Sequence, residues 1–352
     1  MTDLFSKIKE VTELPAISGH EAPVRDYLRK QITPHVDEVV TDGLGSIFGV
    51  RHSEVADAPR IMVAGHMDEV GFLVRHISEI GMLYLIRVGG VIDKSLEMQK
   101  VRITTANGTK VYGLMNAVKD ETGSVKEIYV DIGASSKEDV KAMGVEIGNM
   151  VTFDSNCHSI AQDSILAGKA MDDRTGCYVI AESLKQLHHQ KCEAELIFSA
   201  TSSEEVGIRG AKTAVTLVDP DIVFAIDVAN HPELVRDYTN HRQIGKGVMI
   251  VCYDKTLAPN EKLLKFVKKI ADKEEIPYQL DMFSGGGTDA GSAHLIGRGK
   301  LAMVIGIPLR YCHGSVSYVH KSDLDAAVKL VCALSKQLTR EKFNEFTNFI
   351  GG

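Results

Sequence analysis

The sequence predicts an α/β fold in which a mostly parallel sheet flanked by helices is interrupted by a small all-β domain. Three patterns support this. Strand-like runs alternate with amphipathic helices after residue 168, as in βαβ units. The apolar run Ile61–Gly65 is continuous, as in a strand covered on both faces. Between about 70 and 165 the sequence becomes rich in strand-forming patterns, and Asn107-Gly108 marks a tight hairpin turn.

The expected elements follow in order along the chain. Apolar residues at helical spacing predict helices over 3–14 and 21–32, ahead of the strand at 61–65. The β-rich stretches are 71–91, 100–115, 126–133 and 148–154. The later elements are a helix at 175–189, a strand at 194–201, a helix at 210–218, strands at 221–228 and 247–254, a helix at 260–275, a strand at 301–307 and a last helix from Ser322. We therefore expect one domain formed by residues 1–69 and 166–352, and an inserted β-barrel domain at 70–165.

Composition and charge narrow the class of protein. The 352 residues are 44% hydrophobic and 25% charged, and the net charge of -7 gives no electrostatic footprint for nucleic acid or acidic membranes. No apolar run approaches the ~20 residues of a membrane span, and "MTDLFSKIKEV" lacks the features of a signal peptide. The six cysteines are scattered, without a C-x-x-C pair. We expect a cytoplasmic protein that binds neither nucleic acid nor membrane.

Imidazoles and carboxylates follow several of the predicted strands. The residues concerned are His66 and Asp68 after the strand at 61–65, Glu204 and Glu205 after 194–201, Asp227 at the end of 221–228, His313 beyond 301–307, and Asp172 and Asp173 just before the helix at 175–189. Each alone is typical of a loop or a helix cap. Because ligands of open α/β sheets bind beyond the carboxyl ends of the strands, we expect these side chains to form one site.

The residue types indicate a hydrolytic metal site. Two imidazoles and several carboxylates suit divalent zinc, cobalt or manganese. One carboxylate can bridge two ions about 3.5–4 Å apart, the spacing of two-metal hydrolases. A second carboxylate must accept the proton of the attacking water and pass it to a leaving amine. The Glu204-Glu205 pair could supply one ligand and one base, and Asp68 could take the far N–H of the His66 ring.

Six motifs in this order carry a family resemblance: "AGHMDEVGF", "GKAMDDRTG", "SSEEVGIRGAK", "AIDV", "FSGGGTDAGSAH" and "RYCH". Together they resemble the tetrahedral, dinuclear-metal aminopeptidases, which include glutamyl and deblocking aminopeptidases and relatives labelled endoglucanases. The resemblance implies a zinc-peptidase-like catalytic domain with an inserted β-barrel for oligomerisation and substrate access. It also implies a homododecamer, a bridging water or hydroxide, and cytoplasmic trimming of peptides.

The resemblance further implies a role for each motif residue. His66, Asp172 and Glu205 would hold one ion, and Asp172, Asp227 and His313 the other, so that Asp172 bridges. Glu204 would be the general acid/base and Asp68 would orient the His66 ring. The preferred reading is therefore an aminopeptidase with two divalent ions per chain, zinc or cobalt before manganese. A metal-dependent amidase or deacylase acting on N-acyl substrates is the alternative.

Several assignments are open between neighbours. His320 competes with His313, which is preferred because it follows the strand in "RYCH", and Asp173 competes with Asp172. Asp289 is a candidate for the free amine of the substrate. Arg310 could meet an acidic substrate side chain or serve as a structural ion-pair partner. Together with the resemblance to glutamyl aminopeptidases, Arg310 leads us to expect acidic N-terminal residues to be preferred over neutral ones. Cys312, beside His313, is expected to be a small buried residue.

Overall fold

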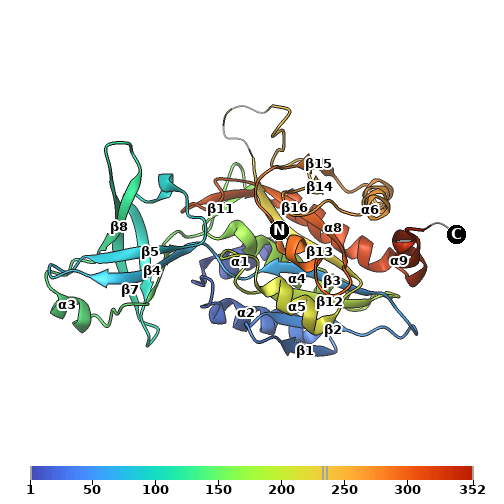
Figure 1. Ribbon diagram of the computed structural model, residues 1–352, viewed down its shortest axis with the longest axis horizontal. Coiled ribbons are helices and arrows are strands. Elements are labelled where there is room, and N and C mark those ends of the chain that lie inside the picture. The colour runs from blue at the N-terminus through green and yellow to red at the C-terminus, as the bar shows by residue number, and fades with distance from the viewer. Residues whose placement is uncertain (1, 232–233, 235–236, 351–352) are drawn as a thin grey trace.

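The computed structural model describes residues 2–231, 234 and 237–350. Figure 1 shows an α/β body on one side and a β-barrel that projects from it on the other. Within the described residues the α/β body contains one sheet of eleven strands, and the second body is a closed barrel. No helix in this part of the chain is long and apolar enough to cross a membrane.

The sheet of the α/β body is mixed. Its strands, in spatial order, are β1 (Glu38–Thr41), β2 (Ile47–Arg51), β12 (Glu195–Thr201), β3 (Arg60–His66), β13 (Ile222–Asn230), β16 (Leu301–Arg310), β17 (Ser317–His320), β11 (Ile165–Gly168) and β10 (His158–Ile160), with β14 (Val248–Tyr253) and β15 (Tyr278–Met282) branching from β16. The central run β12-β3-β13-β16 is parallel. Outer pairs such as β1–β2 and β10–β11 are antiparallel, because a short turn can join antiparallel strands but not parallel ones. The sheet is therefore less parallel at its edges than expected.

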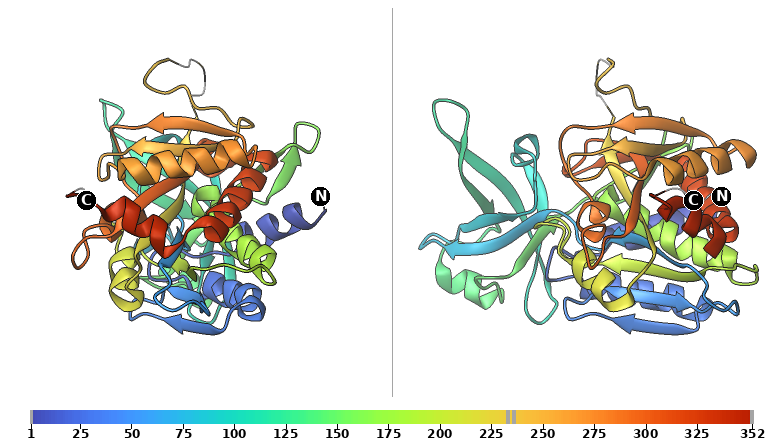
Figure 2. Two further views of the ribbon diagram at one scale, coloured as in Figure 1. Left: turned by 90° about the vertical axis from the view of Figure 1, so that its right-hand side faces the viewer. Right: turned by 45° about the vertical axis from the view of Figure 1, so that its right-hand side comes forward.

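Helices cover both faces of this sheet (Figure 2). They are α1 (Thr2–Glu13), α2 (Ala22–Ile32), α4 (Met171–Leu187), α5 (Gly210–Val218), α6 (Glu261–Lys273), α7 (Asp289–Ala293), α8 (Lys321–Gln337) and α9 (Arg340–Thr347), with a 3₁₀ turn at Thr33–His35. Along β3, Ile61 and Val63 pack in one apolar cluster with α1, α2, α4, α6 and α8. Met62 and Ala64 pack in a second cluster with α5 and α7. This alternation along a strand buried on both faces explains the continuous apolar run.

The barrel closes in the order β4-β5-β8-β7-β6-β9. Its strands are β4 (Gly71–Ile77), β5 (Leu83–Val88), β6 (Gln99–Thr104), β7 (Lys110–Lys119), β8 (Val125–Asp131) and β9 (Met150–Phe153), with α3 (Lys137–Ala142) and a 3₁₀ turn at Asp93–Ser95 between strands. Phe72 and Phe153 are buried inside it, with ring centroids 5.8 Å apart. The expected turn at Asn107-Gly108 joins β6 to β7, and Gly108 has φ +83°. The chain returns to the main sheet at β10, so His158–Ile160 pairs outside the barrel.

Helix α4 starts with a break in its backbone. Asp172 and Asp173 have non-helical φ and ψ values, so a kink interrupts the Met171–Leu187 segment near its start. The Asp173 carboxylate accepts the backbone N–H of Gly176 at 2.9 Å, which satisfies one free donor of the first turn. The break turns Asp172 toward the edge of the sheet, where β3 and β13 also deliver polar side chains.

Candidate metal centre

The polar side chains expected from the sequence gather where the central parallel strands end. β3 ends at His66, and Glu204 and Glu205 follow the end of β12. Asp227 lies near the end of β13, and His313 follows β16. Because these four strands run parallel side by side, their carboxyl ends share one edge of the sheet. The register therefore brings together residues that lie up to 247 positions apart (from 66 to 313) in the sequence.

Asp172 lies between the two imidazoles. Its Oδ1 is 3.1 Å from Nε2 of His66, and its Oδ2 is 3.1 Å from Nε2 of His313. Asp173 faces elsewhere, since its carboxylate accepts the backbone N–H groups of His66 and Gly176. Of the two adjacent aspartates, Asp172 is therefore the one that can join two ion positions.

Asp227 lies beside His66 and Glu205 lies beside His313, which is the reverse of the expected assignment. Ligand atoms of His66, Asp172 and Asp227 all lie within 4.8 Å of one another, whereas Oε2 of Glu205 is 3.5 Å from Nε2 of His313. The sheet register explains the correction. Asp227 lies two residues beyond Ala225, which pairs with Ala64, so Asp227 is level with His66. Glu205 stands beyond the end of β12 and extends to the other imidazole.

Asp68 holds the loop that carries the two glutamates. Its Oδ1 accepts the backbone N–H of Glu204 and its Oδ2 that of Glu205, both at 3.1 Å. The hydroxyl of Ser18 donates to Oδ2 at 2.5 Å, a contact that no sequence pattern indicated. Nδ1 of His66 is 2.9 Å from the backbone carbonyl oxygen of Asp68 and 3.5 Å from its carboxylate. The ring is thus oriented mainly by the Asp68 backbone, and the Asp68 carboxylate positions the loop.

Burial and like charges raise the pKa of several carboxyl groups at this edge. The pKa of Glu204 is raised well above its usual value by burial and by Asp227 and Asp289. The pKa of Glu205 is raised to about 7 by burial and by Asp172. Burial also raises the pKa of Asp227 well above the ordinary range, assisted by Asp172. A cluster of acids that is costly to ionise together is typical of a site built around a cation.

The imidazoles shift in the same sense. Burial alone would lower the pKa of His66 and His313, but hydrogen bonds to Asp172 outweigh it. The pKa of His66 is raised well above its usual value and that of His313 to about 9. For Asp172, burial opposes ionisation, but the two imidazoles hold its pKa well below the ordinary range. In the ion-free chain, protons therefore occupy positions that a divalent cation would take.

The donor set fits divalent metal ions. Imidazole nitrogens and carboxylate oxygens are ordinary ligands of zinc and related ions. Oε1 of Glu205 is buried and has no hydrogen-bond partner within the described chain, although a buried carboxylate oxygen normally has one. A cation beside His313 would give this oxygen a partner. The residues present therefore match what an ion would require on the His313 side as well as on the His66 side.

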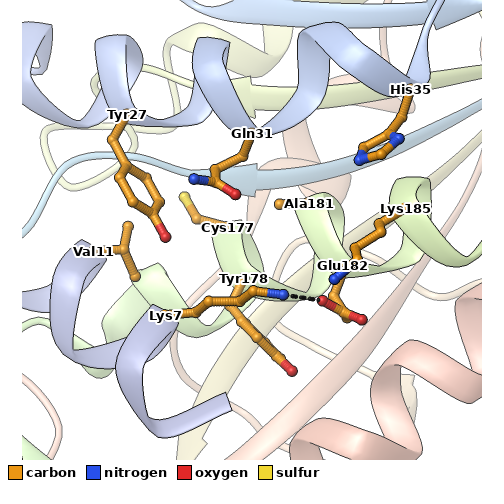
Figure 3. Close-up of a pocket in the computed structure, with 10 residues that line it drawn as sticks. All are labelled: Lys7, Val11, Tyr27, Gln31, His35, Cys177, Tyr178, Ala181, Glu182 and Lys185. Atoms are coloured by element: carbon orange, nitrogen blue, oxygen red, sulfur yellow. Dashed lines mark hydrogen bonds and ion pairs between the residues drawn. The ribbon is translucent and has the colours of Figure 1, made fainter. Parts of the chain in front are cut away.

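A cleft of about 390 Å³ opens onto these groups. It is lined by His66, Ile92, Asp172, Glu204, Glu205, Asp227, Val228, Ala229, Asn230, Arg242, Phe283, Gly285, Gly286, Gly287, Thr288, Cys312 and His313. Figure 3 shows a different hollow, between α1, α2 and α4, crossed by the Lys7–Glu182 ion pair. That hollow measures about 30 Å³, the space of roughly one or two waters. Of these two hollows, the cleft at the strand ends is the one that can take a peptide.

Residues 45–330 match the sequence profile of the M42 glutamyl aminopeptidases. The chain belongs to this family. It is 32% identical to the glutamyl aminopeptidase of Lactococcus lactis, over 99% of this chain and 100% of that protein. Membership fixes the class of enzyme as an aminopeptidase, a hydrolase of peptide bonds.

Solved structures agree with the fold. The aminopeptidase APDkam598 of Desulfurococcus kamchatkensis superimposes with a TM-score of 0.95 at 34% identity, covering 100% of this chain and 99% of that one. The TET1 peptidase of Pyrococcus horikoshii, described as assembling into a tetrahedron or a large octahedral shell, gives 0.84 at 29% identity, over 95% of this chain and 100% of that one. Both resemblances span the α/β body and the barrel.

Three of the other candidates lie outside the immediate donor cluster. Asp289 is buried behind the centre and accepts the Thr201 hydroxyl at 2.5 Å; burial raises its pKa to about 6. Arg310 ends β16 and is not among the cleft-lining residues. His320 precedes α8 and its ring accepts the backbone N–H of Ser322 at 3.2 Å, so it caps a helix. His313 is therefore the imidazole that β16 brings to the cleft.

A buried ionic cluster beneath the centre was missed by the sequence reasoning. Lys169 is fully buried, and its Nζ lies 2.6 Å from Oε1 of Glu69. Arg174, also fully buried, donates to the backbone carbonyls of Met67, Val11 and Ala16. These side chains join α1, the residues that follow β3 and the start of α4, which carry the candidate ligands His66 and Asp172. Charged residues are rarely buried, and the positions of Lys169 and Arg174 beside "AMDD" were the only available signal.

Proposed function

We propose that this enzyme removes N-terminal residues from short peptides at a site that binds two divalent ions. The main support is the position of Asp172: its two carboxylate oxygens each lie 3.1 Å from a different imidazole. Asp227 on the His66 side and Glu205 on the His313 side would complete the two ligand sets. Zinc and cobalt are the preferred ions for such imidazole–carboxylate sets, with manganese possible.

The ions supply two things when bound: polarisation of the scissile carbonyl and a water that ionises near neutral pH. The remaining chemistry belongs to the protein. Glu204 would take the proton of the attacking water and return it to the leaving amine. Glu204 lines the cleft, and it is its backbone N–H that donates to Asp68, so the carboxyl group is left for this task. Its raised pKa suits a group that must both accept and donate a proton. Asp68 would keep the Glu204-Glu205 loop in register with His66.

The cleft offers no free positive charge for an acidic substrate side chain among its described lining residues. Apart from the two candidate ligand imidazoles, the basic side chain among these lining residues is Arg242, and its Nε is 2.7 Å from Oδ2 of Asp281. Arg310, on which an acidic preference would rest, does not line the cleft. We therefore expect neutral N-terminal residues to be accepted at least as well as glutamyl ones. Asp289, held by Thr201, would act on the free amine only through intervening groups.

Self-association is the second part of the proposal, and a homododecamer is its specific form. The TET1 relative can assemble into a tetrahedron or a large octahedral shell. On this chain, Tyr112, Leu114 and Val118 alternate along β7 and are exposed, so they share the outer face of that strand. A second copy of this chain is the proposed occupant, because exposed apolar side chains grouped on one surface indicate an interface.

A cytoplasmic location is proposed as well, supported by the six unpaired cysteines.

The experiment is a panel of aminoacyl chromogenic substrates, assayed after chelation and again after adding zinc, cobalt or manganese. We expect chelation to abolish hydrolysis and at least one of these ions to restore it. N-acylated versions of the same substrates serve as the control. Turnover of the acylated compounds at the rate of the free amines would favour an amidase or deacylase instead.

A further inference from the structure

Cys312 is the one cysteine that lies among the candidate metal ligands within the described residues. Its Sγ is 3.0 Å from Oδ2 of Asp172, the carboxylate oxygen that faces His313. Ligand atoms of Asp172, Cys312 and His313 all lie within 4.8 Å of one another. The side chain is half-buried and lines the cleft. The expectation that Cys312 merely fills space does not explain this position.

An independent feature points to a cation at the same place. The side chain of Glu205 is 5% exposed, its Oε2 lies 3.5 Å from Nε2 of His313, and its Oε1 has no partner within the described residues. An unpaired, buried carboxylate oxygen on a side chain that approaches an imidazole is costly unless a positive ion lies near it. The His313 side therefore presents oxygen, nitrogen and sulfur donors together.

The other cysteines near the core have ordinary partners. Cys177 donates to the backbone carbonyl oxygen of His66 at 3.2 Å, and Cys332 to that of Ser183 at 3.8 Å. Neither is grouped with imidazole and carboxylate donors in the described chain. The arrangement at Cys312 is thus specific to the His313 side of the centre.

We propose that Cys312 is a ligand of the ion on the His313 side, which would then have carboxylate, imidazole and thiolate donors. On binding, the S–H bond breaks, a metal–sulfur bond forms and the proton leaves to water; no oxidant is needed, and a coordinating thiol is deprotonated. The two ion positions would differ in kind, because the His66 side has only nitrogen and oxygen donors. Soft sulfur favours zinc, cobalt or cadmium over manganese and magnesium on the His313 side.

This inference rests on the proposed dinuclear site, and the test separates the two. The apo-enzyme is titrated with cobalt(II), and bound metal and the sulfur-to-cobalt charge-transfer absorption in the near ultraviolet are followed together. We expect two ions per chain, with the charge-transfer band rising for one of them. Cys312→Ser should lose the band while cobalt still binds. Its affinity for the second ion should fall by at least the ~10–100-fold that losing a supporting contact costs. Cys192→Ser, distant from the cleft, is the matched control and should keep the band.

A second measurement needs no variant. In the apo-enzyme, iodoacetamide should alkylate Cys312, and zinc should protect it, with Cys192 labelled equally in both samples as an internal reference. Two bound cobalt ions without a charge-transfer band, or Cys312 labelled at the same rate with and without zinc, would overturn the assignment while leaving the proposed function intact. An apo-enzyme that binds no cobalt would overturn both.

Discussion

At the scale of single residues, the centre is a cluster of buried carboxyl groups whose negative charges repel one another unless a cation lies between them. Asp172 has two imidazole partners, whereas burial raises the pKa of Glu204, Glu205 and Asp227. Adjacent residues have separate tasks. Asp172 faces the imidazoles while Asp173 holds the backbone, and Glu205 approaches His313 while Glu204 lies 4.0 Å from Nε2 of His66. Each of these differences can be tested by replacing a carboxylate with the amide of the same size.

Glu204→Gln and Glu205→Gln are matched isosteric variants of neighbouring residues. Glu204→Gln removes the proposed proton acceptor, so kcat should fall by about 10²–10⁴-fold while both ions stay bound and KM changes little. Glu205→Gln removes a proposed anionic ligand, so metal content should fall, and excess zinc or cobalt should partly restore activity. Kinetics and metal analysis on the two proteins distinguish base from ligand. Full activity in Glu204→Gln would contradict its role.

Metal affinity should rise with pH. His313, with a pKa raised to about 9, and Glu205, at about 7, both hold protons in the ion-free chain at pH 6. An ion must displace those protons, so each one displaced lowers the affinity about tenfold per unit of falling pH below the pKa. Competition with a chelator of known affinity at pH 6, 7, 8 and 9 measures the slope. An affinity that does not change over this range would show that these groups are not ligands.

At the scale of elements, α1, β3 and α4 are held together by buried charges. Lys169 and Glu69 form an ion pair with exposed side-chain fractions of 0% and 3%, and Arg174 bonds to carbonyls of α1 and of the loop after β3. These contacts fix the segments that deliver His66, Asp68 and Asp172. Buried pairs rarely add net stability over an apolar core, but breaking one leaves an uncompensated charge.

Lys169→Met should therefore lower the free energy of unfolding by up to about 3–5 kcal/mol, because the buried Glu69 carboxylate loses its nearest cation. It keeps only Arg174, whose Nη2 is 3.5 Å from Oε1, and the backbone N–H of Ala16 at 3.2 Å. Adding Glu69→Gln to the same chain should recover part of the loss. The matched control is Lys265→Met, which breaks the exposed Lys265–Glu261 pair on α6 and should change stability little. Urea denaturation of the metal-free proteins measures all of them. Equal effects of Lys169→Met and Lys265→Met would refute the structural role of the buried pair.

Sequence patterns located the elements better than the contacts between them. The buried run at 61–65 and the alternation after 168 predicted the strands whose ends carry His66, Glu204 and Asp227, because periodicity records burial directly. The division of Asp227 and Glu205 between two imidazoles depends on register, which one chain does not display. The support from Ser18, Lys169 and Arg174 was missed because long-range hydrogen bonds leave no local pattern.

At the scale of the whole molecule, a segment of the barrel domain lies against the candidate metal centre. The segment after β5 carries Gly89 and Gly90, and a Cβ on Gly90 would lie 3.0 Å from Nδ1 of His313. The backbone N–H of Ile92 donates to the carbonyl oxygen of His313 at 3.2 Å, and Ile92 lines the cleft. Glycine lets this backbone approach the centre closely. The barrel thus contributes a wall of the cleft as well as an outer surface.

The outer face of β7 should mediate assembly. Tyr112→Glu combined with Leu114→Glu places two charges on an exposed apolar face, at positions 58% and 39% exposed. Burying unpaired charges at an interface is unfavourable, so light scattering should show smaller particles than the wild type. Lys126→Glu, an exposed charge on β8, is the control and should leave the particle mass unchanged. A wild-type chain that remains monomeric at micromolar concentration would contradict the assembly proposal.

Asp172 is proposed to join two ions at the carboxyl edge of the sheet, and the rest of the site depends on this role. The most direct measurement is bound metal per chain, determined after chelation, reloading with zinc and removal of free ion, on the wild type and on Asp172→Asn. We expect two ions per wild-type chain and loss of most of both in Asp172→Asn, together with loss of peptide hydrolysis. Two ions and normal hydrolysis in Asp172→Asn, or no zinc bound by the wild type, would contradict it.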